Sequence, residues 1–220
     1  MVIHTERLTL RPWREADAAS LFTYASDPDV GPAAGWPPHR SIEESREIIR
    51  TVFTAPHTFA ICLPETDEPV GSIGLMPPRC ESNSQRGGLE FEVGYWIAKP
   101  FWGLGFAPEA VRAMQRYAFD TLGCKALWCG YYEGNNKSLR VQQKCGFTPH
   151  HVERDVPCEL MGDVRTEYFT YLTREDWRRQ AQCELRDKGT VPLPRSANRK
   201  GSDDGVATTK CYRGTWRARP

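Results

Sequence analysis

Long hydrophobic runs are missing from this 220-residue sequence. No stretch approaches the ~18 consecutive apolar residues of a membrane-spanning helix, and the N-terminus has no apolar core of the signal-peptide kind. We therefore expect a cytoplasmic protein that makes no membrane contact. An excess of charge is missing as well, because the formal net charge is only +1. Overall charge thus gives no reason to expect stable binding to nucleic acid.

Motifs for metal ions and nucleotides are also absent. The eight cysteines include no Cys-x-x-Cys pair, the usual spacing of a zinc site. Half of them fall in or beside expected elements, where small buried thiols are common: Cys62, Cys124, Cys129 and Cys145. His150 and His151 could be ligands, but a strand edge is the favoured interpretation, and we expect no metal. Without Gly-Lys-Ser/Thr or Gly-x-Gly-x-x-Gly, a nucleotide-binding α/β protein is disfavoured.

The hydrophobic pattern predicts a mixed α/β sheet. We expect strands at residues 5–12, 59–63, 70–75, 89–97, 126–131, 147–153 and 166–172. Helices are expected to begin near residues 14 and 41 and to span residues 108–122, 137–144 and 174–186. Strands gather early and alternate with helices in the middle of the chain, which is typical of an α/β architecture.

The two ends of the chain differ in composition. Residues 1–177 hold 18 basic and 24 acidic side chains, whereas residues 178–220 hold 11 basic and 4 acidic ones. Gly, Pro, Ser, Arg and Lys dominate after residue 187 and apolar periodicity stops, which is typical of disorder. We therefore expect one domain over residues 1–177, then the end of a terminal helix and a disordered basic tail. The tail could contact RNA or a membrane, but an inert extension is the favoured interpretation.

A glycine-rich turn stands between an expected strand and an expected helix. It reads Trp102-Gly103-Leu104-Gly105-Phe106-Ala107 and is followed by Pro108, which fits the first turn of a helix. The first backbone N–H groups of a helix have no partner within it, and together with the helix dipole they favour an anion. A diphosphate is the ligand that this pattern favours.

The same loop resembles the acyl-CoA pyrophosphate loop of the GNAT acetyltransferase superfamily. Trp102 stands where the general pattern has Gln or Arg, a change that is usual in the ribosomal-protein-alanine N-acetyltransferase-like (RimJ/RimL type) branch. Three other stretches resemble that branch: residues 5–12, residues 94–97, and Asn135-x-x-Ser138-x-Arg140-Val141-x-x-Lys144-x-Gly146-Phe147. Together with the loop they come in family order and cover about residues 1–177. The resemblance implies a GNAT-type central sheet, mixed and mostly antiparallel, splayed at the cofactor site and flanked by helices.

The resemblance also assigns residues to the cosubstrate acetyl-CoA. The strand at 90–97 is expected to bind the pantetheine arm through the main chain of Tyr95, Trp96 and Ile97, and Gly94 fits a bulge or a close backbone approach. The loop residues Trp102, Gly103, Leu104, Gly105, Phe106 and Ala107 are expected to hold the diphosphate. Asn135 and Ser138 resemble the second cofactor motif, although both could simply cap a helix.

The general acid and the general base are assigned less directly than the cosubstrate-binding residues. Many superfamily members have a tyrosine four residues after the position of Ser138, but this chain has Gln142. The acid role then passes to Ser138, to another tyrosine such as Tyr131, or to solvent. Glu92 is the candidate general base, since a carboxylate beside apolar strand residues has its pKa raised by desolvation. Glu90 lies on the same face of the strand as Glu92. The alternative to a catalytic role is that both are ordinary solvated strand residues.

The acceptor side is expected to include Glu92 and Trp36, the latter as a lid or as a hydrophobic plug. The interpretation that follows is an acetyl-CoA-dependent N-acetyltransferase. It would move an acetyl group to a primary amine, on a protein N-terminus or a small molecule, by direct transfer in a ternary complex. The alternative is a catalytically silent acetyl-CoA-binding regulatory module. Either could be a monomer or a homodimer.

Overall fold

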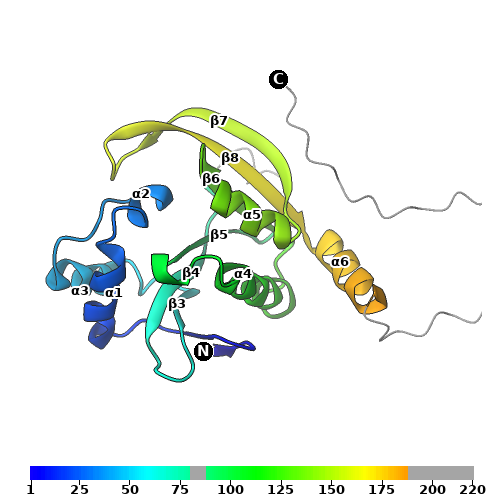
Figure 1. The fold of residues 1–220 in the computed structure, drawn as a ribbon. Coiled ribbons are helices and arrows are strands. Elements are labelled where there is room, and N and C mark those ends of the chain that lie inside the picture. Colours follow the sequence, from blue (N-terminus) through cyan, green and yellow to red (C-terminus); the bar gives the residue numbers. More distant parts are fainter. Residues whose placement is uncertain (80–87, 188–220) are drawn as a thin grey trace, which may run out of the picture.

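The computed structural model describes residues 1–79 and 88–187. In this part of the chain, eight strands form one sheet in the order β1-β2-β3-β4-β5-β6-β8-β7 (Figure 1). Neighbouring strands are antiparallel except β5 and β6, which run parallel. The expected mixed, mostly antiparallel sheet is confirmed. The expected disordered tail falls outside the described residues and stays a prediction, as does the domain boundary at residue 177.

The strands have the following bounds: β1 Ile3–His4, β2 Thr9–Arg11, β3 Thr58–Cys62, β4 Pro69–Met76, β5 Glu90–Ile97, β6 Ala126–Tyr132, β7 Thr148–Cys158 and β8 Asp163–Thr173. The helices are α1 Ala18–Ala25, α2 Gly31–Ala34, α3 Ile42–Thr51, α4 Phe106–Arg116, α5 Asn136–Lys144 and α6 Arg174–Asp187. Short 3-10 turns cover Glu15–Asp17 and Lys99–Phe101, and a π-helical turn, Tyr117–Thr121, extends α4.

Helices cover both faces of the sheet because the strands alternate apolar side chains between two cores. On β3, Ile61 belongs to the larger core together with Met114 of α4. Its neighbour Cys62 belongs to a smaller core with Leu21 of α1 and Ile49 of α3. The period of two in the strand therefore places α4 on one face and the pair α1 and α3 on the other.

The sheet opens between its two parallel strands. β5 and β6 pair only at Glu90–Ala126, Phe91–Leu127 and Glu92–Trp128, although both strands continue, to Ile97 and Tyr132. Each remains paired on its outer side, β5 with β4 and β6 with β8. The open inner edges are the splay that the family resemblance implies. The pairing of β4 with β5 runs without a register shift, so the bulge considered at Gly94 is not present there, and the Met76 methyl lies against Gly94 instead.

Several element bounds differ from the sequence prediction: the strand expected at residues 5–12 is shortened to β2, for example, and two further differences lie near the cleft. α4 begins at Phe106 rather than Pro108, because Gly105 adopts a left-handed conformation (φ 84°) that ends the loop and starts the helix. The stretch between the strands expected at 147–153 and 166–172 is also mostly strand, since β7 extends to Cys158 and β8 begins at Asp163. Both strands are largely solvent-exposed there, so the hydrophobic pattern gives no signal for them.

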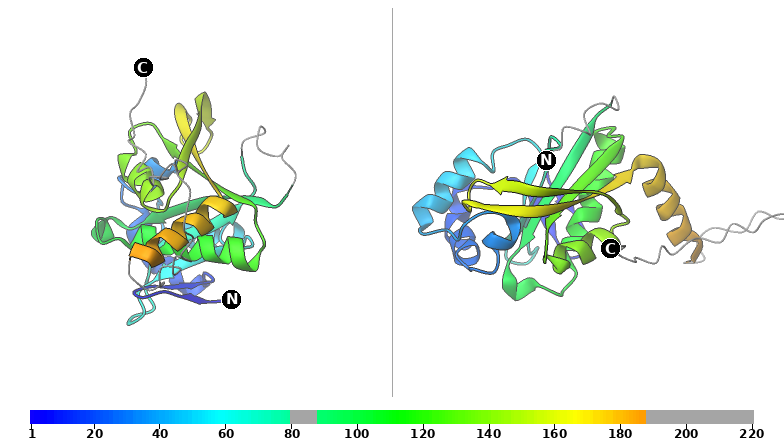
Figure 2. Two further views of the ribbon diagram at one scale, coloured as in Figure 1. Left: turned by 90° about the vertical axis from the view of Figure 1, so that its right-hand side faces the viewer. Right: turned by 90° about the horizontal axis from the view of Figure 1, so that it is seen from above.

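The β7–β8 hairpin reaches across the molecule to α2 (Figure 2). Arg165 Nη1 on β8 donates to the carbonyl oxygen of Pro32 at 2.7 Å, and the Cys158 thiol at the end of β7 lies 3.4 Å from the carbonyl oxygen of Gly35. Asn135 Nδ2 donates to the carbonyl oxygen of Ala33 at 3.0 Å. These three bonds hold α2 against the open end of the sheet.

Candidate active site

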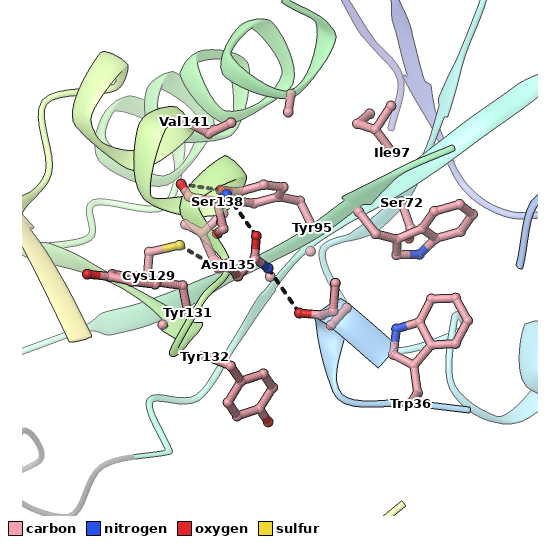
Figure 3. A pocket seen from close by; sticks show the side chains of 18 of the residues that line it. Trp36, Ser72, Tyr95, Ile97, Cys129, Tyr131, Tyr132, Asn135, Ser138 and Val141 are labelled. Carbon is pink, nitrogen blue, oxygen red and sulfur yellow. Dashed lines mark hydrogen bonds between the residues drawn. The ribbon is translucent and has the colours of Figure 1, made fainter. Parts of the chain in front are cut away.

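A cleft of about 1870 Å³ enters the sheet where β5 and β6 separate. Its lining includes the open edge of β5, the glycine loop before α4, the first turns of α5 and the facing parts of α2, β6 and β8, together with Arg79 and parts of β4 and of residues 48–58. Figure 3 shows labelled side chains of β5, β6 and α5, and Trp36, around one space. Apart from Leu104, which is 51% exposed and does not line the cleft, the residues that the sequence assigns to a cosubstrate and to an acceptor line one continuous cavity.

The glycine loop presents unpaired amides. Gly103 and Gly105 both have positive φ, 81° and 84°, which lets the backbone turn sharply into α4. Within the described residues, the N–H groups from Gly103 to Ala107 make no hydrogen bond, as expected for a loop leading into a helix N-terminus. A row of free donors at the positive end of a helix suits a phosphate or diphosphate.

Trp102 buttresses this loop. Its Nε1 donates to the carbonyl oxygen of Ile97 at 2.7 Å, and the ammonium group of Lys137 lies 3.4 Å from the centre of its ring. A cation over an indole face is attracted by the ring quadrupole. The aromatic replacement of Gln or Arg in the loop pattern therefore joins the end of β5 to the start of α5, and it places a positive charge beside the loop.

The main-chain groups of β5 do not all face the cleft. The Val93 carbonyl points toward β6, where the Cys129 thiol lies 3.3 Å from it. N–H and C=O groups alternate between edges along a strand, so those of Tyr95 also face the gap, as does the Ile97 carbonyl, which Trp102 binds. Trp96 pairs with Ser72 on the β4 side. Of the three residues expected to offer main-chain contacts, Tyr95 is the best placed.

The start of α5 carries the second expected motif. Asn135 is the N-cap, since its Oδ1 accepts from the Ser138 N–H at 3.1 Å while its Nδ2 holds α2. The Ser138 hydroxyl lies 3.0 Å from the Tyr95 hydroxyl, and Gln142 Nε2 donates to it at 3.1 Å. Burial raises the pKa of Tyr95 well above its ordinary value. Asn135 thus has a structural role here, whereas Ser138 lies in a hydrogen-bonded cluster that lines the cleft.

Two buried carboxylates face the cleft. Glu92 on β5 and Glu167 on β8 are each 2% exposed, and one guanidinium group joins them. Arg79 Nη2 lies 2.5 Å from Glu92 Oε1 and 2.7 Å from Glu167 Oε1, while Nε and the main-chain N–H of Arg79 also donate to Glu92. Burial would lower the pKa of Arg79, but hydrogen bonds and charge from both carboxylates outweigh it and raise it. Burial also raises the pKa of Glu167 above its usual value.

Glycine at position 130 makes room for this cluster. Gly130 lies on β6, between the strands that carry the two carboxylates. A Cβ atom there would come within 2.4 Å of Glu167 Oε1, closer than real Cβ contacts allow, and within 3.1 Å of Arg79 Nη2, which is tight. Any other residue at position 130 would have to displace the ion cluster.

Aromatic residues form another part of the cleft wall, away from the two carboxylates. Trp36, just after α2, packs edge-to-face on Trp96 with ring centroids 5.9 Å apart, and both line the cleft. Tyr132 lies on the opposite side, with the Arg165 guanidinium 4.8 Å from its ring centre. Trp36 is half-buried and packs against the smaller core, and its role as a lid or as a plug stays a prediction.

Sequence reasoning missed Arg79 and Glu167 as site residues, and it treated Tyr95 only as a main-chain contact. Arg79 stands in a polar loop and carries no motif. Glu167 had a weak signal, because it is the one charged residue of the strand predicted at 166–172. Glu90, the other carboxylate on β5, does not line the cleft, and its oxygens accept from Trp128 Nε1 and the Tyr171 hydroxyl.

An open mixed sheet, a glycine loop that starts a helix and a cleft between diverging parallel strands define an acetyltransferase of the GNAT type. The sequence matches the acetyltransferase (GNAT) domain family over residues 7–148, and the chain belongs to this family. It is therefore an N-acetyltransferase by family, and the resemblance stated from the sequence is confirmed.

Individual relatives agree with this assignment. The chain is 30% identical over 178 residues to "Uncharacterized N-acetyltransferase p20" of Bacillus licheniformis, which covers 79% of this chain and 97% of that protein. A GNAT-family acetyltransferase from Bacillus anthracis shares the fold with a TM-score of 0.68 at 22% identity, covering 80% of this chain and 99% of that one. The ribosomal-protein-S5-alanine acetyltransferase from Vibrio fischeri does so with a TM-score of 0.62 at 17% identity, covering 80% and 98%.

Two kinds of feature are absent from the described part of the chain. No helix in the described ranges is long and apolar enough to cross a membrane. Among the same residues, no three His, Cys, Asp or Glu side chains are grouped so that they could hold a metal ion.

Proposed function

We propose that this protein transfers an acetyl group from acetyl-CoA directly to a primary amine while both substrates are bound. The observation that carries the proposal is the convergence, in one cleft, of a diphosphate-type loop and a pair of buried carboxylates. The loop and the open edge of β5 suit the diphosphate and the pantetheine arm of the donor. The carboxylates suit an acceptor that arrives as a cation.

A base is needed because a free amine has a pKa near ~10 and is mostly protonated at neutral pH. Glu92 and Glu167 share one guanidinium, so the cluster is negative overall and favours an ammonium group over a neutral or anionic acceptor. Arg79 donates to both oxygens of Glu92 but only to Oε1 of Glu167. Glu167, with its raised pKa, is the better placed proton acceptor, and Glu92 holds Arg79 in position beside it.

The remaining steps use main-chain and hydroxyl groups. The amine attacks the thioester carbonyl, and the N–H of Tyr95 on the open edge of β5 is placed to stabilise the oxyanion that forms. The C–S bond then breaks, the thiolate leaves beside Ser138, and the second amine proton is lost to water. The balance is one ammonium and one thioester giving one amide, one thiol and one proton.

Direct transfer is favoured over an acetyl-enzyme intermediate. Of the cysteines in the described residues, Cys129 lines the cleft, and burial, reinforced by the charge of Glu92, raises its pKa well above its ordinary value. A thiol must ionise to act as a nucleophile, so this environment disfavours Cys129 as an acyl carrier.

The decisive experiment is an acceptor screen. Acetyl-CoA is incubated with primary amines, including peptides with free N-termini and small amines, and released thiol is measured. We expect turnover with at least one cationic primary amine. Binding of acetyl-CoA without turnover across the whole panel would instead support the regulatory module.

Variants of the carboxylates test the assignment of the base. We expect Glu167→Gln to lower kcat by about 100-fold, a typical contribution of general base catalysis, with little change in the Kd of acetyl-CoA. Glu92→Gln should also lower kcat, because Arg79 loses its main anchor. Glu90→Gln is the matched control on the same strand and should keep full activity. Unchanged turnover in Glu167→Gln would exclude it as the base.

A further inference from the structure

The side chain of Gln142 on α5 is buried and makes three hydrogen bonds. Its side chain is 1% exposed. Nε2 donates to the Gly130 carbonyl oxygen and to Ser138 Oγ, both at 3.1 Å, and Oε1 accepts from Thr170 Oγ1 at 2.8 Å. A buried amide whose polar atoms are all satisfied is held in a single orientation.

The chemistry of its neighbours decides which way this amide points. The Gly130 carbonyl can only accept, so the atom that faces it must be the NH₂ group and not the amide oxygen. The oxygen is then on the side of Thr170, whose hydroxyl can donate to it. Both hydrogens of the NH₂ group are used in this arrangement, and one of them is donated to the Ser138 hydroxyl.

Tyr95 approaches the same hydroxyl from β5 (Figure 3). Its hydroxyl lies 3.0 Å from Ser138 Oγ and 3.3 Å from the Ser138 carbonyl oxygen, and the shorter contact favours Oγ as the acceptor. Ser138 Oγ then receives hydrogen bonds from Tyr95 and from Gln142. A serine hydroxyl accepts two hydrogen bonds and donates one, so its own hydrogen is directed away from both neighbours.

We propose that Gln142 and Tyr95 are positioning residues that aim the Ser138 hydroxyl hydrogen at the departing sulfur of the acyl donor. This inference rests on the proposed transfer to an amine. Gln142 stands where the family pattern has an acidic tyrosine. In this chain the donor to the sulfur is the Ser138 hydroxyl instead, oriented by Gln142 and by the phenol of Tyr95 on β5.

The chemistry favours a hydrogen bond over proton donation. A thiol has a pKa near ~8.5, and a serine hydroxyl is a far weaker acid, so moving the serine proton to a thiolate is uphill. Ser138 therefore keeps its proton and stabilises the negative charge that develops on sulfur as the C–S bond breaks. The thiolate takes its proton from water after the acetyl group has left.

A double-mutant cycle tests whether Gln142 acts through Ser138. We expect Gln142→Met to lower kcat by about tenfold with the Kd of acetyl-CoA within about twofold of wild type. Ser138→Ala should lower kcat at least as much. In the Ser138→Ala background, Gln142→Met should have no further effect, because its target is already missing. An equal loss in both backgrounds would overturn the proposal.

Controls separate this role from packing. Gln143→Met makes the same chemical change one position along the helix, at a half-buried residue that does not line the cleft, and should keep wild-type kcat. Tyr95→Phe retains the ring and should reproduce the Gln142→Met loss. Thermal unfolding of each variant identifies any loss of fold.

A binding measurement decides the question even if no acceptor is turned over. The affinity of free CoA is measured by calorimetry from about pH 7 to about pH 9.5, with acetyl-CoA as the reference. If the serine hydrogen stabilises the thiolate, CoA binds wild type several-fold more tightly as its thiol ionises, a range centred near ~8.5. Ser138→Ala and Gln142→Met should lose this gain. A pH gain in Gln142→Met equal to that of wild type would refute the positioning role, whatever the outcome of the amine screen.

Discussion

Glu92 and Glu167 bind the same guanidinium group, although β6 separates the strands that carry them. Two carboxylates can approach so closely across a strand only where that strand carries no side chain between them. Gly130 meets this condition, because a Cβ atom there would overlap Glu167 Oε1. The position of the proposed base therefore depends on a glycine as well as on Arg79.

Gly130→Ala should damage activity and stability together. The added methyl group must displace a buried, ion-paired carboxylate, and we expect a loss of about 1–3 kcal/mol in the free energy of unfolding, as for overpacked cores. Turnover should fall more than tenfold while acetyl-CoA still binds. Denaturant unfolding and thiol-release kinetics measure the two effects, and a fully active, wild-type-stable variant would show that the cluster can rearrange freely.

The pH dependence of kcat/KM should report Glu167. A base must be ionised, and burial places the pKa of Glu167 above its usual 4.5, so activity should fall as pH drops through that raised value. Glu167→Gln should lack this acidic limb. Because the folded-state pKa is raised, protonation of Glu167 favours folding: this contribution is complete below the usual value and is lost as pH rises through the folded-state pKa. The stability of Glu167→Gln relative to wild type should therefore increase across the same range.

Alanine at Gly103 should weaken the binding of acetyl-CoA about tenfold, because a Cβ atom projects where the diphosphate would contact the loop amides. Gly123→Ala is the matched control. Both glycines have positive φ, 81° and 72°, and open space where a Cβ atom would stand, so both variants carry similar backbone strain, about 1–2 kcal/mol. Calorimetry should show weaker binding only for Gly103→Ala. Gly105→Glu, which adds bulk and negative charge beside the diphosphate, should abolish binding, and retained affinity would place the cosubstrate elsewhere.

Arg11 should be essential for the fold rather than for the chemistry. Its guanidinium is buried, with a side chain 3% exposed, and pairs with Asp17 at 2.7 Å and Asp67 at 2.6 Å. Arg11→Met leaves the buried Asp17 carboxylate without its charged partner, and we expect a loss of about 3–5 kcal/mol in the free energy of unfolding. Arg14 also binds Asp67 at 2.6 Å but is 59% exposed, so Arg14→Met should cost about 0–1 kcal/mol. Equal losses in urea unfolding would contradict this distinction.

Removal of residues 188–220 should leave kcat/KM unchanged. The reason is positional, since the described residues that line the cleft all precede residue 168. The truncated chain, which retains α6, is compared with the full chain by thiol release and by the Kd of acetyl-CoA. A substantial loss of turnover in the shortened chain would assign the basic tail a role in acceptor recognition.

The sequence by itself determined the features that depend only on residues adjacent along the chain. The turn from Trp102 to Ala107, with glycines where φ is positive, predicts an anion site because its amides have no local partner, and Asn135 with Ser138 specifies a helix start. Family order of the motifs then predicted the mixed sheet and its splay. Hydrophobic periodicity missed only elements that bury little, such as the solvent-exposed halves of β7 and β8.

Only the tertiary structure decided which side chains surround the proposed acid–base groups. Arg79 reaches Glu92 across 13 positions and Glu167 across 88, and Tyr95 reaches Ser138 across 43. Charge pairing and hydrogen bonding act through space, so no local pattern records which strand lies beside which. In the sequence, Gln142 stands where many family members have a tyrosine. In the fold, it is a satisfied amide on α5 that shares the Ser138 hydroxyl with the phenol of Tyr95, which comes from β5.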